Sequence, residues 1–149
     1  MSENIKIRPD KHTLLDYIDQ FQQGKIQVPA FQRDFIWGNN KKLELLDSIQ
    51  KGYPIGSILL WRPDFNTDED FYKFESKEIG FYKIPERATN DYFYILDGYQ
   101  RLSLLFGCLV NPKKTKLQRD ENNWFKEFNI VYNLRDDVFE MNKKKDFSS

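Results

Sequence analysis

Apolar residues recur at helical spacing in two segments of the first third of the chain. The first segment places four of them on one helical face, namely Leu14, Leu15, Ile18 and Phe21. Thr13 precedes this segment as a candidate N-cap, and Gly24 follows it as a stop. The second segment carries a similar set, namely Leu43, Leu45, Leu46 and Ile49, and Gly52 follows it. The pattern therefore predicts one helix between residues 13 and 24 and another from about residue 39 to residue 52.

Runs of β-branched, aromatic and aliphatic residues predict three strands, namely residues 26–28, 57–62 and 92–96. The first run meets Pro29, which cannot donate to a ladder and therefore stops pairing or marks a sheet edge. The second run has the continuous apolar character of a buried strand. The third run leads into a predicted helix over residues 100–109.

The remaining segments are more polar. Residues 63–91 are predicted to be a variable loop or hairpin insertion, because their apolar residues alternate only loosely, around Gly80. Residues 113–123 are predicted to form an exposed connection. Residues 127–134 predict the last strand, and residues 138–141 are expected to pair with it as a hairpin.

Composition indicates one globular domain, residues 1–149. Hydrophobic residues make up 40% and charged residues 31%, which is typical of a folded rather than a disordered chain. Lys and Arg together number 23, as do Asp and Glu, so the balance does not support a strongly basic nucleic-acid binder. The aromatic share is 16%; such rings usually build the core, and exposed ones can stack on bases.

The single histidine and single cysteine exclude several kinds of site. His12 and Cys108 are far apart in the sequence, so no Cys/His zinc site is expected. A catalytic triad would have to use His12, which lies in an N-terminal stretch before a helix. Cys108 stands among apolar residues and is predicted to be a buried thiol, in keeping with a cytoplasmic location. The chain has no run of about 18 apolar residues, so no membrane span is expected.

The stretch YFYILDGYQRLSLLFG places polar residues where a predicted strand becomes a helix. A helix N-terminus offers free N–H groups and a positive dipole end, so it attracts anions. Gly98 permits close approach of a ligand, and Arg101 adds a fork that matches phosphate oxygens. Asp97 can cap the helix, orient Arg101 or hold a phosphate-bound metal. The corner is therefore a candidate phosphate site; alternatively, Asp97-Gly98 is an ordinary turn and Arg101 pairs with Asp97 on the surface.

A second Gln-Arg pair, Gln32-Arg33, lies between predicted elements and among aromatic residues, namely Phe31, Phe35 and Trp37. One interpretation buries the rings and leaves Arg33 in water. The other brings Arg33 to the same anion as Arg101, with an aromatic ring beside a base. The glycine-rich residues 52–57 lack the P-loop pattern and are followed by a strand, so they are interpreted as a structural turn.

Three segments in this order, VPAFQRDFIW, LLDSIQKGYPIGSILLW and YILDGYQRLSLL, resemble the N-terminal domain of the GmrSD family of modification-dependent restriction proteins. That domain is related to the nucleotide-binding fold of ParB and sulfiredoxin. The resemblance covers about residues 13–110 and, more weakly, the strand around Ile130. It implies an α+β fold, a ParB/sulfiredoxin-like small mixed sheet flanked by helices.

The corner departs from the family pattern at two positions. The family usually has Asp-Gly-Gln-Gln-Arg followed by Leu-Thr-Thr-Leu, whereas Tyr99 replaces the first glutamine here and Leu104 replaces a threonine. If that glutamine touches the nucleotide, we expect Tyr99 to weaken binding or change the base preference. Sulfiredoxin has a reactive cysteine in the corresponding turn; this turn has none, so sulfinic acid reductase chemistry is not expected.

The resemblance implies a domain that binds a nucleoside triphosphate with Mg²⁺, with or without hydrolysis, and regulates cleavage of modified foreign DNA. The predicted catalytic residues are Asp97, Gln100 and Arg101, with Asp97 as the metal ligand. The predicted nucleotide contacts are Gln32, Arg33, Gly98, Tyr99, Gln100 and Arg101. In this hypothesis Gln100 orients water or a phosphate oxygen, and Gln32 supports Arg33.

Cleavage itself is expected from an HNH-type nuclease domain or subunit, because His12 alone cannot supply the histidines of such a site. The end KKKDFSS is either a frayed tail or, as we favour, a boundary within a longer protein. The alternative function is a DNA- or protein-binding module without nucleotide dependence. Its DNA contacts would be basic residues that are otherwise solvated, namely Lys113, Lys114, Lys116, Arg119 and Lys143 to Lys145.

Overall fold

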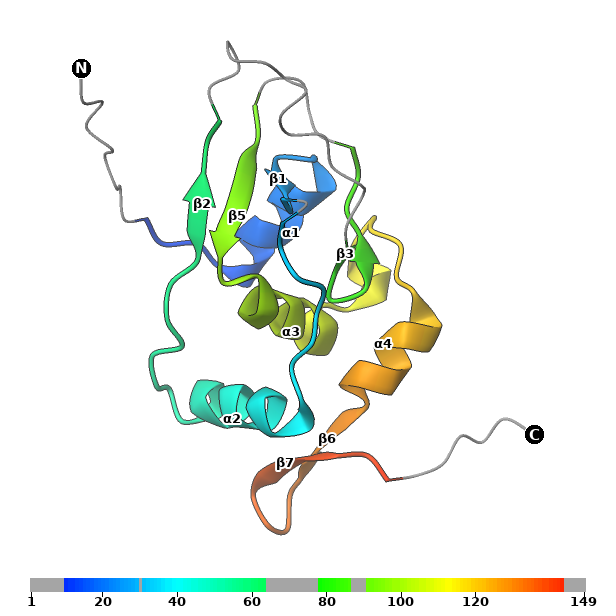
Figure 1. Cartoon of the computed structure of the whole chain (residues 1–149). Coiled ribbons are helices and arrows are strands. Elements are labelled where there is room, and N and C mark those ends of the chain that lie inside the picture. Colours follow the sequence, from blue (N-terminus) through cyan, green and yellow to red (C-terminus); the bar gives the residue numbers. More distant parts are fainter. Residues whose placement is uncertain (1–9, 30, 64–77, 87–90, 144–149) are drawn as a thin grey trace.

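The central strand of the main sheet is β5 (Phe93–Asp97), and the sheet order is β1-β5-β2. β1 (Ile26–Gln27) runs parallel to β5, whereas β2 (Leu59–Trp61) runs antiparallel to it, so the sheet is mixed (Figure 1). This computed structural model describes residues 10–29, 31–63, 78–86 and 91–143. Together with four α-helices in that part of the chain, the sheet confirms the predicted α+β class.

The first two predicted helices are confirmed. α1 (Leu14–Gln22) begins with a capping box in which Thr13 and Asp16 bond to each other's backbone. Its Phe21 is fully buried and meets Phe106 edge to face at 5.0 Å. α2 (Asn39–Gln50) follows Gly38, which provides no side-chain cap.

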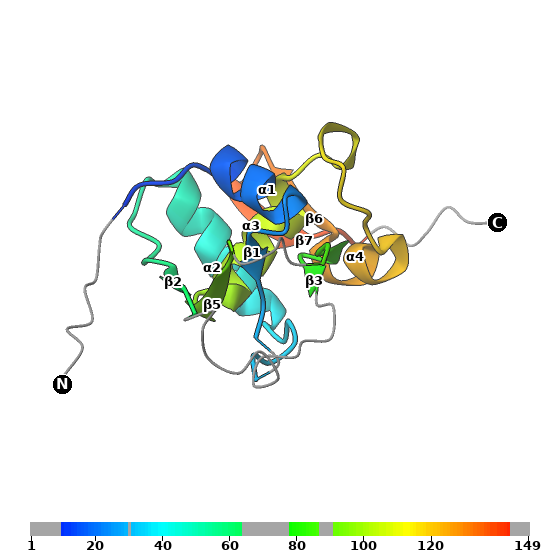
Figure 2. The same ribbon diagram turned by 90° about the horizontal axis from the view of Figure 1, so that it is seen from above.

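α3 (Tyr99–Leu109) is the helix around which the others pack (Figures 1 and 2). It contributes to both apolar clusters of the described chain. Leu102 and Phe106 join the cluster beneath the sheet, and Leu104 joins the cluster formed with α2 and α4. The strand and helix that meet at residue 98 are thus fixed by the core on both sides.

The hairpin predicted around Gly80 is confirmed, as β3 (Glu78–Ile79) and β4 (Tyr82–Lys83). Its two turn residues, Gly80 and Phe81, both have positive φ, at 56° and 65°, as a type I′ turn requires. Residues 64–77 and 87–90 of the predicted insertion lie outside the described residues.

α4 (Glu121–Phe128) was not expected, because residues 113–123 were predicted to be a connection and residue 127 the start of a strand. Asp120 caps this helix through the Asn123 amide at 3.2 Å. Only Trp124 and Phe128, four residues apart, turn apolar groups to the core, so the helical period is hidden by polar neighbours. The connection before it contains a short 3₁₀ turn, η2 (Pro112–Lys114).

The last strand is correspondingly shorter than predicted. β6 (Ile130–Asn133) pairs antiparallel with β7 (Val138–Met141), which confirms the hairpin. The prediction of a buried strand over residues 57–62 was wrong in burial, since β2 lies at the sheet edge and Leu59 is 45% exposed. No helix of the described residues is long and apolar enough to cross a bilayer.

Glycine allows the β3–β4 hairpin to approach α3 closely. A Cβ atom on Gly80 would lie 2.5 Å from the Gly107 nitrogen and 2.6 Å from the Ser103 carbonyl oxygen. Both atoms belong to the α3 backbone, which cannot move aside as a side chain can.

We therefore expect Gly80→Ala to lower the free energy of unfolding by about 2–5 kcal/mol, from overpacking and left-handed strain together. Gly52→Ala is the matched control, because Gly52 also has positive φ, at 71°, but has no neighbour within 4 Å of the added Cβ. It should cost only about 1–2 kcal/mol. Urea denaturation measures both, and equal losses would contradict the close approach.

Candidate functional site

The corner between β5 and α3 leaves the start of the helix open. Gly98 adopts the left-handed conformation, with φ of 95°, and the helix has no side-chain cap. The Asp97 carboxylate instead accepts a hydrogen bond from the Gly98 N–H at 2.9 Å. The first-turn amides therefore retain donor capacity, whereas α1 and α4 have side-chain caps.

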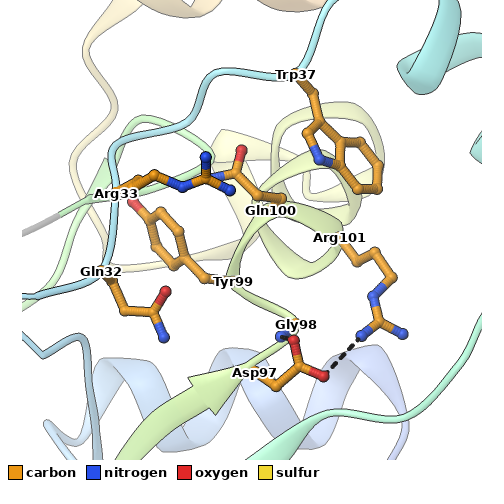
Figure 3. Close-up of a pocket in the computed structure, with 8 residues that line it drawn as sticks. All are labelled: Gln32, Arg33, Trp37, Asp97, Gly98, Tyr99, Gln100 and Arg101. Atoms are coloured by element: carbon orange, nitrogen blue, oxygen red, sulfur yellow. Dashed lines mark hydrogen bonds and ion pairs between the residues drawn. The ribbon is translucent and has the colours of Figure 1, made fainter.

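A pocket of about 230 Å³ lies at this corner. All seven residues predicted for the site line it, together with one that was not in the predicted set, Trp37 (Figure 3). The seven are Gln32, Arg33, Asp97, Gly98, Tyr99, Gln100 and Arg101. The loop after β1 and the β5–α3 corner thus converge, although more than 60 residues separate their bonded pairs.

Arg101 is held at the pocket wall and is not turned out into solvent. Its Nη1 donates to the Ile55 carbonyl at 2.9 Å, and its Nη2 lies 3.6 Å from an Asp97 carboxylate oxygen. The Arg101 side chain is 21% exposed, and that of Asp97 is 74% exposed. The surface ion pair considered from the sequence is therefore present, but it is long and solvated, and such pairs contribute little.

Gly56 makes the position of Arg101 possible, and sequence reasoning missed this. A Cβ atom on Gly56 would lie 2.0 Å from Nη1 of Arg101, and its φ is 89°. The interpretation of residues 52–57 as a structural turn overlooked that the turn also seats the guanidinium. The available signal was a second glycine directly before a strand.

Two glutamine side chains hold the loop after β1 against the corner. The Gln32 amide donates to the Ile95 and Leu96 carbonyls at 3.0 and 2.9 Å. The Gln100 amide donates to the Asp34 carbonyl at 2.9 Å and accepts from the Ile36 N–H at 3.0 Å. Gln100 is thus a positioning residue in this structure, and its part in orienting water stays a prediction.

Arg33 reaches the same pocket from this loop. Its side chain is one of those that line the pocket (Figure 3). The residue is exposed, and within the described chain no ion pair or side-chain hydrogen bond engages it. Arg33 therefore presents an uncompensated positive charge to the pocket.

The aromatic residues of the loop have different surroundings. Phe35 packs on Phe128 at 5.1 Å, beside the buried Lys42, whose ammonium is 5.4 Å from the Phe35 ring. Lys42 in turn bonds to the Glu127 carboxylate at 2.6 Å. Phe31 is 71% exposed and does not line the pocket, so Trp37 is the loop ring that does.

Tyr99 contributes to the pocket lining, but its side chain is buried in the core. It is 6% exposed, and its hydroxyl donates to the Glu78 carbonyl of β3. Burial raises the pKa of Tyr99 to about 12. The residue that replaces the family's first glutamine thus ties the corner to the β3–β4 hairpin through its side chain.

The family comparison supports the resemblance inferred from the motifs. The family model described as "GmrSD restriction endonuclease, N-terminal domain" matches residues 14–149. The chain belongs to the GmrSD family, as an N-terminal domain. An uncharacterized protein of Methanocaldococcus jannaschii is 29% identical over 113 residues, which cover 72% of this chain and 18% of that protein. No solved structure matches the chain.

Asp97 is the carboxylate that lines the pocket of this GmrSD N-terminal domain. One of its oxygens accepts from Gly98, and the side chain is largely exposed at the pocket. No group of three or more histidine, cysteine or acidic residues among the described residues forms a ready-made metal cage. Mg²⁺ commonly uses one or two carboxylates, several waters and substrate phosphates, so Asp97 suits a metal that arrives with a ligand.

The basic residues considered above as DNA contacts are not all available to bind phosphates. Arg119 donates two hydrogen bonds to Glu121 and lies 3.7 Å over the Trp124 ring. Exposed lysines remain on and near η2, namely Lys113, Lys114 and Lys116. Lys143 is exposed, and Lys144 and Lys145 lie outside the described residues.

The buried phenol of Tyr99 predicts a loss of stability at high pH. Below pH 10 the folded and unfolded states both keep the proton, so the full contribution is present. Between pH 10 and about 12 only the unfolded chain ionises, so stability falls by up to about 1.4 kcal/mol per pH unit from this group. Tyr99→Phe should make urea-measured stability fall less steeply in this window.

The same variant loses the bond to the Glu78 carbonyl, so we expect it to be about 1–3 kcal/mol less stable at neutral pH. Tyr53→Phe, at a 61% exposed ring, serves as the control and should keep the wild-type slope. An unchanged slope in Tyr99→Phe would contradict the burial of this hydroxyl.

Proposed function

We propose that this chain is a nucleoside-triphosphate-binding regulatory domain of a modification-dependent DNA restriction system. The observation that carries the proposal is the convergence of Arg33, Arg101 and the uncapped start of α3 on one pocket. Membership of the GmrSD family supports the association with restriction. Nucleotide binding rests on the charges and donors of the pocket.

These groups suit the phosphates of a nucleotide. Two guanidinium groups and the N-terminal amides of a helix are all donors, and each favours negative charge. Asp97 is the pocket residue of opposite charge. A polyphosphate that brings Mg²⁺ would satisfy both signs, because Asp97 would help to hold the ion and the arginines would bind the phosphates.

In this proposal Asp97 would hold Mg²⁺ together with the phosphates, and the ion would supply charge neutralisation. Arg33 approaches the phosphates from the loop, and Arg101 approaches from α3. Gln32 and Gln100 keep that loop in place through its backbone. The pocket, at about 230 Å³, is smaller than the roughly 300–1,000 Å³ of typical ligand sites, so it suits the phosphate part of a nucleotide.

Hydrolysis is the further activity that we assign to this site. Water would attack the terminal phosphorus as its bond to the bridging oxygen of the diphosphate leaving group breaks. Asp97 would position that water through the metal, and Arg101 would stabilise charge on the transferred phosphoryl group. Phosphate release, measured for the wild type and for Asp97→Asn at saturating nucleotide and Mg²⁺, tests this step. Cleavage of modified DNA is assigned to an HNH-type domain or subunit outside this chain.

Removal of either arginine is expected to weaken binding of Mg²⁺-nucleoside triphosphate about ten- to a hundredfold, since each forms charge-assisted hydrogen bonds to phosphate. Isothermal titration calorimetry of Arg33→Ala and Arg101→Ala measures the effect. Arg135→Ala removes an exposed arginine from the β6–β7 turn, outside the pocket, and should bind like the wild type. Equal affinities for all four proteins would contradict the proposed function.

Gly56→Ala tests the position of Arg101 without changing the charge of the protein. The added Cβ would lie 2.0 Å from Nη1, so the guanidinium must shift from its present position. We expect an affinity loss no larger than that of Arg101→Ala, which removes the charge altogether. Gly52→Ala, in the same turn but facing open space, should retain wild-type affinity; wild-type affinity in Gly56→Ala would contradict the role of the seated guanidinium.

A further inference from the structure

We infer that Trp37 is the base-binding residue of the pocket, which makes the ligand a nucleoside triphosphate rather than a free polyphosphate. This inference rests on the proposed function. Trp37 lines the pocket together with both arginines, and Figure 3 shows its ring standing across from Arg33 on the side of Arg101. A planar apolar surface therefore borders the site that receives the phosphates.

Trp37 differs from the other aromatic residues of its loop in having an available surface. Phe35 is taken up by contacts with Phe81 and Phe128, at 6.5 and 5.1 Å. Phe31 lies outside the pocket lining. Trp37 is half-buried: part of it packs against the apolar cluster of α2, α3 and α4, and the rest faces the pocket.

The indole N–H of Trp37 is also left without a partner. Within the described chain no hydrogen bond engages its Nε1, whereas Nε1 of Trp124 donates to the Gly107 carbonyl at 2.6 Å. In Figure 3 the nitrogen edge of Trp37 is turned toward Gln100 and the interior of the pocket. A half-buried tryptophan with a free donor is suited to a ligand that offers both a ring face and an acceptor.

The loop around Trp37 is fixed before any ligand arrives. Gln100 bonds to the backbone at Asp34 and Ile36, the residue directly before Trp37. Directly after it, Gly38 is the N-cap residue of α2. The ring is thus held between two anchored points, which lowers the entropy cost of stacking on a base.

The experiment compares ligands that differ only in the nucleoside. Calorimetry with Mg²⁺ is carried out for ATP, GTP, CTP and UTP and for inorganic tripolyphosphate, on the wild type, Trp37→Leu and Trp37→Phe. Trp37→Leu removes the stacking face but keeps an apolar contact with the core cluster. Ile36→Ala, at a 58% exposed side chain outside the pocket lining, is the control for disturbance of the loop.

We expect Trp37→Leu to weaken binding of at least one nucleoside triphosphate about ten- to a hundredfold, the usual loss for a base–aromatic stack. Its affinity for tripolyphosphate should be unchanged. Trp37→Phe should lie between Trp37→Leu and the wild type, and Ile36→Ala should bind all ligands normally.

Two results would overturn the inference while leaving the proposed function intact. In the first, Trp37→Leu binds every nucleotide like the wild type. In the second, it loses nucleotide and tripolyphosphate equally, which shows that Trp37 acts only by supporting the loop. If the wild type binds none of these ligands, the proposed function fails, and this inference fails with it.

Discussion

The left-handed turn at Gly98 is the constraint on which the pocket depends. β5 ends at Asp97 and α3 begins at Tyr99, so Gly98 alone connects the strand to the helix. A Cβ atom there would lie 2.4 Å from the Ile58 side chain, which indicates how closely the approach to β2 packs on this corner. Because both elements are fixed in the core, the amides of the first helical turn point to one defined place.

The groups around the corner come from three separate segments. The loop after β1 supplies Arg33 and Trp37, the turn before β2 supplies the seat of Arg101, and the corner supplies the amides. Side-chain amides and a backbone carbonyl, rather than a dense set of ion pairs, hold these segments together. The arginines are therefore positioned without having their charge fully neutralised, which is the condition an anion site requires.

The sequence predicted the parts of this architecture that depend on local signals. Three such features were found as expected, namely the helix cap at Thr13, the strand that leads to Asp97 and the glycine turn at residue 98. Each depends on the conformational preference of its own residues. The grouping of Arg33 with Arg101 was one of two interpretations of the sequence, because spacing alone does not bring residues 68 positions apart together. The structure places both at one pocket.

Features that depend on tertiary neighbours were not predictable in the same way. α4 was missed because its two core contacts lie among polar residues. β2 was expected to be buried because its run is continuously apolar, whereas its exposure depends on its place at the sheet edge. Gly56 was interpreted as a turn residue, because the residues around it do not indicate that the distant Arg101 guanidinium packs against it. The amide partners of Gln100 are likewise backbone groups of a distant loop.

An amide NMR titration of the chain with Mg²⁺ and inorganic tripolyphosphate tests whether the start of α3 binds an anion. We expect saturable shifts of the backbone N–H signals of Tyr99, Gln100 and Arg101, together with the side-chain signals of Arg33. Shifts centred on the lysines near η2, or no shifts at any concentration, would contradict an anion site at the start of α3.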